Sequence, residues 1–301
     1  YTTYMKPSEI KKTKKLLADL VEAFPRIPNE KKKETLQFIE VKTVELARYD
    51  FHTFMRYMAP EIMPDDFIDG VHLHLFAEKL EGVYEAAFKG KAENTNKYKQ
   101  KLQMMLPPGS MKSLTLNLFV CWVYGKRPDA RILHVGTSST FAEDNFGSRI
   151  RDVMKSTRYA KVFPNTKVKY DRKDYIKTTK GGEYYCCGAG TSIVGRRGHI
   201  TICDDIISEQ NADSKVERTK ICEWYVPGLR SRLLTGGCEV IVNTRWHLDD
   251  ISGYIIALDS KAKVADWDIV RIPAFLDMDS AELLGLPEGG SFWPELWPDD
   301  A

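Results

Sequence analysis

The chain is organised around one stretch, Leu106-Pro107-Pro108-Gly109-Ser110-Met111-Lys112-Ser113. A short apolar run, residues 102–106, leads into it, and a longer apolar run, residues 114–124, follows it. A strand, a tight polar turn, Lys-Ser and a helix form the layout of a phosphate-binding loop, in which backbone N–H groups and a helix N-terminus surround an anion. We therefore predict that residues 108–113 bind a nucleotide, with Lys112 on the outer phosphates and Ser113 on Mg²⁺.

The stretch departs from the strict pattern G-x-x-x-x-G-K-[ST], because Leu106 and Met111 occupy its two glycine positions. Gly109 and the two prolines must therefore shape the turn. Taken alone, Lys-Ser after a Pro-Gly turn is also typical of an ordinary loop. Both interpretations stay open until the downstream sequence is considered.

Composition limits the class of protein. The 301 residues, 43% of them hydrophobic, suffice for a sizeable core. With 44 basic and 42 acidic residues the net charge is +2, so the total does not indicate nucleic-acid binding and any basic surface must be local. We find no apolar run long enough to span a membrane and no signal peptide. A missing initiator Met and an end at Asp-Asp-Ala lead us to expect an excised domain.

The cysteines and histidines suggest no metal centre. The six cysteines form no C-x-x-C pair and lie mostly in apolar runs, which predicts buried thiols in a reducing cytosol. The six histidines show no metal-binding spacing along the chain, and only His72 and His74 lie close together in sequence. We therefore do not expect catalytic zinc.

The N-terminal part of the chain is charged and helix-prone. Residues 1–50 are predicted to form a helical segment, with helices beginning near Ser8 and Asn29. Its lysine clusters could contact DNA phosphate, although a solvated helix face is the preferred interpretation. Another helix is predicted over residues 66–88. We divide the chain into this segment, a core domain over residues 51–275 and the start of a linker over residues 276–301.

Strands and helices alternate from residue 102 onward, which predicts an α/β fold with a mainly parallel sheet flanked by helices. Strands are expected at residues 102–106, 131–135, 199–203, 238–242 and 267–272. Helices are expected at residues 112–124, 141–155, 216–224 and 249–258. Residues 167–187 alternate apolar and polar around Lys180-Gly181-Gly182, which predicts a β-hairpin insertion.

A second motif is Asp204-Asp205, at the end of the strand predicted over residues 199–203. A nucleotide hydrolase needs carboxylates at such a position, so we predict that Asp204 holds Mg²⁺ opposite Ser113 and that Asp205 polarises the attacking water. Enough chain lies between Lys112 and Asp204 for an intervening strand and helix. An isolated Asp pair can instead serve as a helix cap.

Two further segments carry polar side chains. Before the Asp-Asp strand the chain reads Gly188-Ala189-Gly190-Thr191-Ser192-Ile193-Val194-Gly195-Arg196-Arg197-Gly198. Such arginines can stabilise charge on a γ-phosphate, although arginines beside strands are usually surface groups.

Residues 239–253 form a third motif, in which a strand presents Asn243 and Thr244 at its carboxyl end. In open α/β sheets such strand ends converge on one ligand crevice.

Together these motifs resemble the large terminase subunit of tailed bacteriophages. The resemblance rests on Leu-Pro-Pro-x-x-x-Lys-Ser, on Gly-Arg-Arg-Gly before the Asp-Asp strand, and on Thr-Arg-Trp-His-x-Asp-Asp-x-x-Gly over residues 244–253. The closing run Phe292-Trp293-Pro294-Glu295-Leu296-Trp297 is similar as well. The likeness covers roughly residues 50–300 and implies a P-loop NTPase of the additional-strand, RecA-like type, which binds ATP and Mg²⁺ over residues 51–275.

The resemblance also implies a role for each residue singled out above. Lys112 and Ser113 would be the Walker A phosphate and metal residues, and Asp204 the Walker B metal carboxylate. Asp205 would be the catalytic acid, where Glu is more usual, and Asn243 with Thr244 would form the coupling motif. A charge-neutralising arginine, acting on the same chain's ATP or a neighbour's, is also expected. Its first candidates are Arg196 and Arg197, and its reserves are Arg232 and Arg245.

The implied function is that of an ATP-driven motor that packages double-stranded DNA into a viral procapsid. Its partners would be double-stranded DNA, the portal protein, the small terminase subunit and further copies of itself. On the procapsid those copies would form a pentameric ring, whereas the protein would be a monomer in solution. It would act in the host cytoplasm and not at a membrane. Family members usually carry a C-terminal nuclease domain, and none fits after Ala301, so nuclease activity is not expected here.

Two rival functions stay open. The first is a helicase-like, DNA-dependent ATPase that acts on single strands. The second is a nucleotide-binding module that does not hydrolyse ATP, in which Asp205 and the arginines are structural.

Overall fold

A computed structural model of the chain describes residues 5–63, 67–89, 99–263 and 267–298. Its centre is an eight-stranded sheet with the strand order β3-β4-β5-β2-β6-β7-β1-β8. The strands are β1 Lys101–Met105, β2 Arg131–Gly136, β3 Val168–Asp171, β4 Tyr175–Thr178, β5 Glu183–Gly188, β6 Gly198–Asp204, β7 Leu233–Asn243 and β8 Trp267–Arg271.

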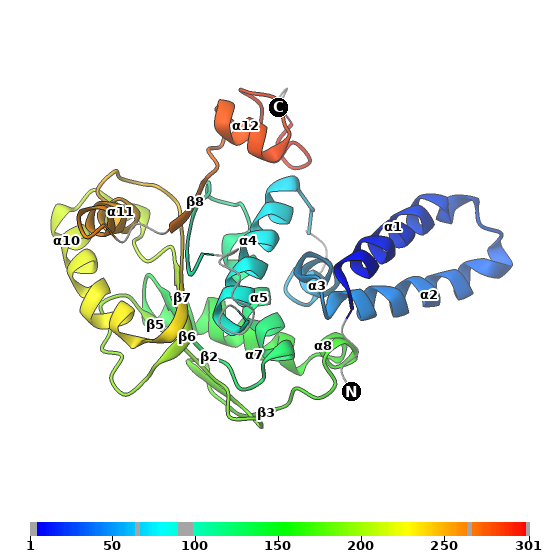
Figure 1. Cartoon of the computed structure of the whole chain (residues 1–301), viewed down its shortest axis with the longest axis horizontal. Coiled ribbons are helices and arrows are strands. Elements are labelled where there is room, and N and C mark those ends of the chain that lie inside the picture. Colours follow the sequence, from blue (N-terminus) through cyan, green and yellow to red (C-terminus); the bar gives the residue numbers. More distant parts are fainter. Residues whose placement is uncertain (1–4, 64–66, 90–98, 264–266, 299–301) are drawn as a thin grey trace.

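Helices cover both faces of this sheet (Figure 1). The α-helices are α1 Pro7–Ala23, α2 Asn29–Ala47, α3 Phe51–Met58, α4 Val71–Phe88, α5 Lys112–Lys126, α6 Ser139–Ala142, α7 Ser148–Lys155, α8 Thr157–Val162, α9 Glu209–Ala212, α10 Lys215–Trp224, α11 Ile251–Lys261 and α12 Met278–Leu284. Helices α3, α4, α5 and α7 pack on one face, where they form the larger apolar core. Helices α10 and α11 cover the other face with a smaller core.

The strand order confirms the predicted fold. Five neighbouring pairs are parallel, namely β2 with β5, β2 with β6, β6 with β7, β7 with β1, and β1 with β8. Strand β7 lies between β1, which leads into the 106–113 loop, and β6, which ends at Asp204. One strand inserted between those two defines the additional-strand, RecA-like type of P-loop NTPase sheet. Its parallel strands carry the apolar runs that burial on both faces requires.

The hairpin predicted around Lys180-Gly181-Gly182 is present, but it is not separate from the central sheet. Strands β4 and β5 are antiparallel on either side of this turn. Strand β5 then pairs with β2 in parallel over six positions, from Arg131 with Glu183 to Gly136 with Gly188. The hairpin therefore extends the sheet at one edge, because the backbone of β5 pairs with that of β2 along the whole length of both strands.

Two predicted helices differ from the observed ones. The helix expected over residues 66–88 begins only at Val71, because the backbone of the preceding residue, Gly70, is extended. Gly70 packs so closely on Trp293 that a Cβ there would lie 2.8 Å from the ring. Position 66 itself lies outside the described residues. The helix expected over residues 141–155 contains a π-helical turn at Glu143–Gly147. The five-residue step from Phe141 to Phe146 fits this wider turn.

The N-terminal helices α1 and α2 form a hairpin that projects from the body of the molecule (Figure 1). Only Leu46 and Ala47 of these two helices are buried, where α2 meets α3, and Val44 packs against the core beside them. An ion pair between Lys14 and Asp50 joins the arm to the cap of α3. The lysine-rich sequence thus forms a helical arm, while the domain boundaries proposed above stay a prediction.

The cysteines are buried, as the sequence predicted. All six cysteines are buried free thiols. Among the described residues, no helix is both long and apolar enough to cross a membrane.

Arg230 lies at the centre of a partly buried ion-pair network at the opposite end of the sheet from the 106–113 loop. Its guanidinium contacts Glu239 Oε1 at 2.8 Å and the two oxygens of Asp259 at 2.8 and 3.1 Å. Lys101 Nζ and Trp267 Nε1 also donate to Asp259. Because Glu239 and Asp259 are almost completely buried, their charges depend on these donors.

We predict that Arg230→Met lowers the free energy of unfolding by about 3–5 kcal/mol, because it leaves two buried carboxylates with one cation fewer. The control is Arg271→Met, which removes the exposed ion pair with Asp277 and should leave the free energy of unfolding almost unchanged. Denaturant unfolding of both variants measures the difference. Equal losses would contradict the idea that burial makes the Arg230 network important.

Candidate nucleotide site

Three polar segments meet at one edge of the sheet because the strands before them are parallel neighbours. Strand β1 pairs with β7 up to Met105 with Asn243, and β6 pairs with β7 up to Asp204 with Val242. The carboxyl ends of β1, β7 and β6 therefore lie side by side. This arrangement brings together the 106–113 loop, Asp204-Asp205 and Asn243-Thr244, as the sequence predicted.

The 106–113 loop forms a tight turn that leads directly into α5. The Ser110 hydroxyl is buried and donates to the Pro107 carbonyl at 2.7 Å. Gly109 and Met111 both have left-handed backbone conformations, with φ values of 75° and 58°. Met111 occupies the N-cap position of α5, which begins at Lys112, without a capping hydrogen bond from its side chain. A left-handed conformation suits glycine and is strained for methionine, so Met111 occupies a position whose backbone favours glycine.

Lys112 is buried and points across the strand ends. Its ammonium donates to the Pro107 carbonyl and to the Thr244 hydroxyl, each at 2.9 Å. It also lies 3.6 Å from Asp205 Oδ2. One lysine thus contacts all three segments, which is the arrangement needed to place positive charge beside a phosphate group.

Asp205 is held by the third motif. Its Oδ1 accepts a hydrogen bond from the Thr244 backbone N–H at 2.7 Å. Its own backbone is left-handed, with φ of 44°, a conformation that Asp adopts more readily than most residues. Asp205 is half-buried, and its other oxygen faces Lys112.

Asp204 is completely buried, and neither carboxylate oxygen has a hydrogen-bond partner among the described residues. Burial and the neighbouring Asp205 charge raise the pKa of Asp204 to about 7, although the nearby Ser113 hydroxyl and Lys112 lower it. An unpartnered buried carboxylate beside a hydroxyl fits the oxygen ligands that Mg²⁺ prefers. Ser113 and Asp204 therefore suit the metal that the sequence predicted for them.

His134 is a site neighbour that the sequence analysis missed. It lies in β2, stacks on the Phe146 ring at 4.0 Å and hydrogen-bonds the Tyr184 hydroxyl through Nδ1 at 3.1 Å. Its Nε2 lies 3.9 Å from Asp204 Oδ2. Burial lowers the pKa of His134 to about 3, so it stays neutral next to Asp204. A polar residue inside the apolar run of β2 is the signal that would have found it.

Asn243 is turned into the protein. Its side chain contacts Asp250 Oδ2 at 3.3 Å and accepts from the Ser252 hydroxyl at 2.7 Å. Asp250 also caps α11 by accepting from the Gly253 N–H, and it pairs with Arg245 at 2.8 Å. Of the two residues predicted to sense phosphate, Thr244 contacts Lys112 directly, while Asn243 connects β7 to α11.

Three of the four candidate arginines, Arg196, Arg197 and Arg232, lie at the far ends of the strands from Lys112. Arg196 and Arg197 come just before β6, whose other end carries Asp204, and about 20 Å of strand separates them. The Arg196 guanidinium stacks on the Tyr185 and Tyr175 rings at 3.9 and 4.8 Å. Arg232 likewise precedes β7, and Arg245 is paired with Asp250. Among the four, only Arg245 lies near this chain's own phosphate loop, because it follows Thr244 and its Nη1 contacts Met105 Sδ at 3.3 Å.

The closing aromatic run lies beside the loop instead. A Cβ on Gly109 would lie 3.0 Å from the Trp297 ring, so this tryptophan covers the turn. Trp297 packs on Phe292 and Trp293, which also contact the His72 ring. The aromatic residues 292–297 thus pack between the start of α4 and the phosphate loop.

No protein-family model and no curated protein matches the sequence. Several solved structures do resemble the chain, and large terminases of bacteriophages are among them. The likeness is one of fold, because sequence identity to each of these structures is low.

The large terminase of a thermophilic bacteriophage, in complex with ATP-γ-S, is 15% identical with a TM-score of 0.42, and the match covers 68% of this chain and 48% of that one. The HK97 bacteriophage large terminase is 12% identical with a TM-score of 0.41, covering 65% and 38%. The ATPase domain from Thermus phage P74-26 is 20% identical with a TM-score of 0.34, covering 48% and 59%. The chain thus spans less than two thirds of each terminase, and the roles of its residues rest on its own geometry.

We predict that glycine at position 111 is more stable than alanine there by about 1 kcal/mol. Neither Met111→Gly nor Met111→Ala keeps the methionine side chain, so their comparison isolates the cost of the left-handed backbone. Denaturant unfolding measures both free energies. Alanine as stable as glycine would contradict a strained loop.

The buried Asp204 should make stability depend on pH. Because its folded pKa of about 7 exceeds the ordinary value of 3.8, the folded state holds the extra proton, and stability falls as pH rises from about 4 to 7. In Mg²⁺-free buffer, Asp204→Asn should therefore exceed the wild type at pH 8 by about 2–4 kcal/mol and match it near pH 4. The exposed control Asp152→Asn should show no such difference. Asp204→Asn less stable than wild type at pH 8 would overturn this explanation.

Proposed function

We propose that this chain is the ATP-hydrolysing motor domain of a viral terminase large subunit, which moves double-stranded DNA into a procapsid. The observation that supports ATP hydrolysis best is the contact of Lys112 with Thr244 and Asp205, beside the unpartnered carboxylate of Asp204. A cation donor, a metal carboxylate and a second acid meet at the ends of three neighbouring strands. This set supplies what phosphoryl transfer to water requires.

In the proposed reaction the protein acts by positioning and by charge. The N-terminus of α5 and the Lys112 ammonium bind the triphosphate, which takes the place of the Pro107 carbonyl as a partner of Lys112. Ser113 and Asp204 would hold Mg²⁺, which neutralises charge on the phosphates. Asp205 is fixed through Oδ1 by the Thr244 N–H, and its other oxygen, Oδ2, which faces Lys112, would orient the attacking water.

Thr244 is well placed to pass the state of the nucleotide to the rest of the domain. Its hydroxyl contacts Lys112, and its backbone N–H contacts Asp205. The preceding residue, Asn243, binds Asp250 and Ser252 at the start of α11. A change in the contacts of Lys112 therefore reaches α11 through one short segment, which supports the coupling role proposed for Asn243 and Thr244.

The arginine that completes the site would come from a neighbouring copy. Arg196 and Arg197 lie about 20 Å of strand from Asp204, too far to reach the chain's own phosphates. Arg197 is exposed, whereas Arg196 is stacked on two tyrosines. We therefore propose Arg197 as the residue that acts on a neighbour's ATP in a ring. The further partners of the proposed motor are double-stranded DNA, the portal protein and the small subunit.

Lys112→Ala and Asp204→Ala should each lower the turnover number for ATP by at least about a hundredfold, because each removes charge stabilisation at the phosphates. Lys155→Ala and Asp152→Ala on α7 are the controls, since both side chains are exposed and belong to surface ion pairs. Steady-state phosphate release measures all four. Hydrolysis that survives both site variants would exclude this site.

Mixing experiments test the arginine. Arg197→Ala should be inactive alone but should restore turnover when mixed with Lys112→Ala, because each variant supplies what its neighbour lacks. Turnover of the wild type should then rise more steeply than linearly with protein concentration. Strictly linear turnover, unaffected by mixing, would mean a self-contained site and would remove Arg197 from it.

The rival functions predict other outcomes. A packaging motor should not separate the strands of a duplex, so strand displacement coupled to ATP use would favour a helicase-like enzyme. Tight ATP binding without turnover, even with DNA and assembled partners present, would favour a nucleotide-binding module.

A further inference from the structure

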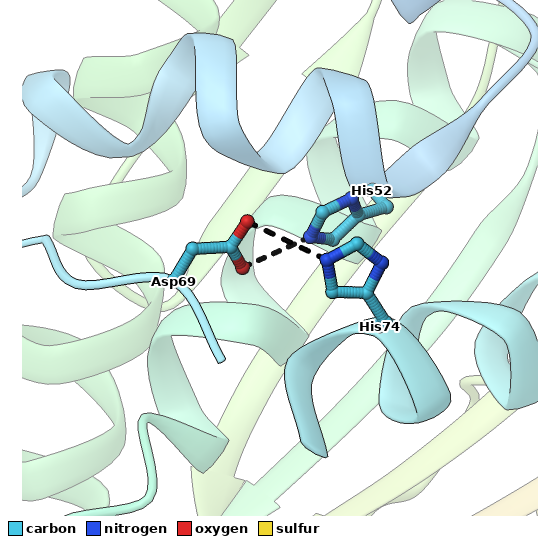
Figure 2. A group of neighbouring side chains, drawn as sticks. All are labelled: His52, Asp69 and His74. Carbon is cyan, nitrogen blue, oxygen red and sulfur yellow. Dashed lines mark hydrogen bonds and ion pairs between the residues drawn. The ribbon is translucent and has the colours of Figure 1, made fainter. Parts of the chain in front are cut away.

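His52, Asp69 and His74 form a compact cluster on the side of the molecule where α3 meets the start of α4. His52 lies on α3, His74 lies on the first turn of α4, and Asp69 belongs to the segment just before α4. Figure 2 shows the three side chains pointing toward one another from these three places. The residues are far apart or irregularly spaced in sequence, so spacing along the chain gave no sign of this cluster.

The geometry of the cluster suits one metal ion. His52 Nε2 lies 3.0 Å from Asp69 Oδ1, and His74 Nε2 lies 3.6 Å from Asp69 Oδ2. One ligand atom from each residue lies within 4.8 Å of the other two. A tetrahedral zinc ion with bonds of about 2.0 Å holds its ligands about 3.3 Å apart, so small side-chain rotations would bring all three onto one ion.

The surroundings of the cluster provide access for an ion. The rings of His52 and His74 are packed with their centroids 3.5 Å apart, and both line a cavity of about 600 Å³. Charged residues of both signs, Lys14, Asp50, Glu78 and Glu81, line the same cavity, so an ion can reach the histidines through a polar opening. One cation competes directly, because Arg56 Nε lies 3.3 Å from Asp69 Oδ2.

We propose that His52, Asp69 and His74 bind a divalent ion of the first transition row, for which Zn²⁺ is the representative ion. Two imidazoles and one carboxylate are ligands that such ions prefer, whereas Mg²⁺ prefers oxygen ligands alone. The three protein ligands leave one position open toward the cavity. The ion would tie α3 to the start of α4, and the site is separate from the Mg²⁺ position proposed at Ser113 and Asp204.

The test is calorimetric titration of Zn²⁺ into the metal-stripped 301-residue protein, without nucleotide and with Mg²⁺ in excess. We expect one site, and His74→Ala should weaken its affinity at least about tenfold. His74 is exposed, so its loss should leave the fold intact, which circular dichroism verifies. Asp69→Asn should weaken binding as well, while Glu78→Gln, one turn further along α4 at the rim of the same cavity, should not.

Two further measurements distinguish this site from other sources of binding. Arg56→Gln should strengthen Zn²⁺ binding severalfold, because it removes the cation that competes for Asp69. Bound Co²⁺ should show ligand-field absorption without thiolate charge-transfer bands, which would otherwise indicate cysteine ligation. Unchanged affinity in His74→Ala, thiolate bands, or loss of binding in excess Mg²⁺ would each overturn the proposal.

Discussion

The parallel alignment of β1, β7 and β6 is the constraint on which the nucleotide site depends. The register that pairs Met105 with Asn243 and Asp204 with Val242 fixes where three loops leave the sheet. A slip of one residue would turn the buried side chains of β7 to the opposite face and separate Thr244 from both Lys112 and Asp205. The long buried run of β7 therefore determines the chemistry as well as the core.

Within this frame the protein keeps several unfavourable features together. Met111 and Asp205 both hold left-handed backbones, and Asp204 is a buried carboxylate without a hydrogen-bond partner among the described residues. Each feature costs stability in the folded protein, and all lie close to Lys112 at the strand ends. Such a concentration at one edge, beside well-packed cores on both faces of the sheet, is typical of a site whose groups are arranged for a ligand.

Much of this arrangement followed from local sequence. Apolar runs that end in a polar turn located β1, β6 and β7, and the strand–helix alternation gave the mainly parallel sheet. Helix starts were less predictable: α4 begins at Val71, after the extended Gly70, and the tight contact of Gly70 with Trp293, far along the chain, could not be read from the local sequence. The π turn before α7 altered a helix whose apolar spacing had already been irregular.

Side-chain partnerships across the fold were the part that sequence could not supply. Nothing near His134 in the chain indicates that it faces Asp204, and nothing near Arg196 indicates that it stacks on tyrosines of β4 and β5. His52 and His74 lie on different helices, and a carboxylate from the intervening segment joins them. Such groups become neighbours only through the packing of whole elements.

The segment from Asp69 to His72 contacts both the histidine cluster and the aromatic residues beside the phosphate loop. The side chain of Asp69 faces the two histidines, while its carbonyl accepts a hydrogen bond from Trp293 Nε1 at 3.3 Å. His72 packs on Trp293 and Phe292, and these rings contact Trp297 over Gly109. Thermodynamic linkage makes any influence through this segment reciprocal. If occupancy at the histidines changes the affinity for a phosphate ligand at the loop, then that ligand changes affinity at the histidines by the same factor.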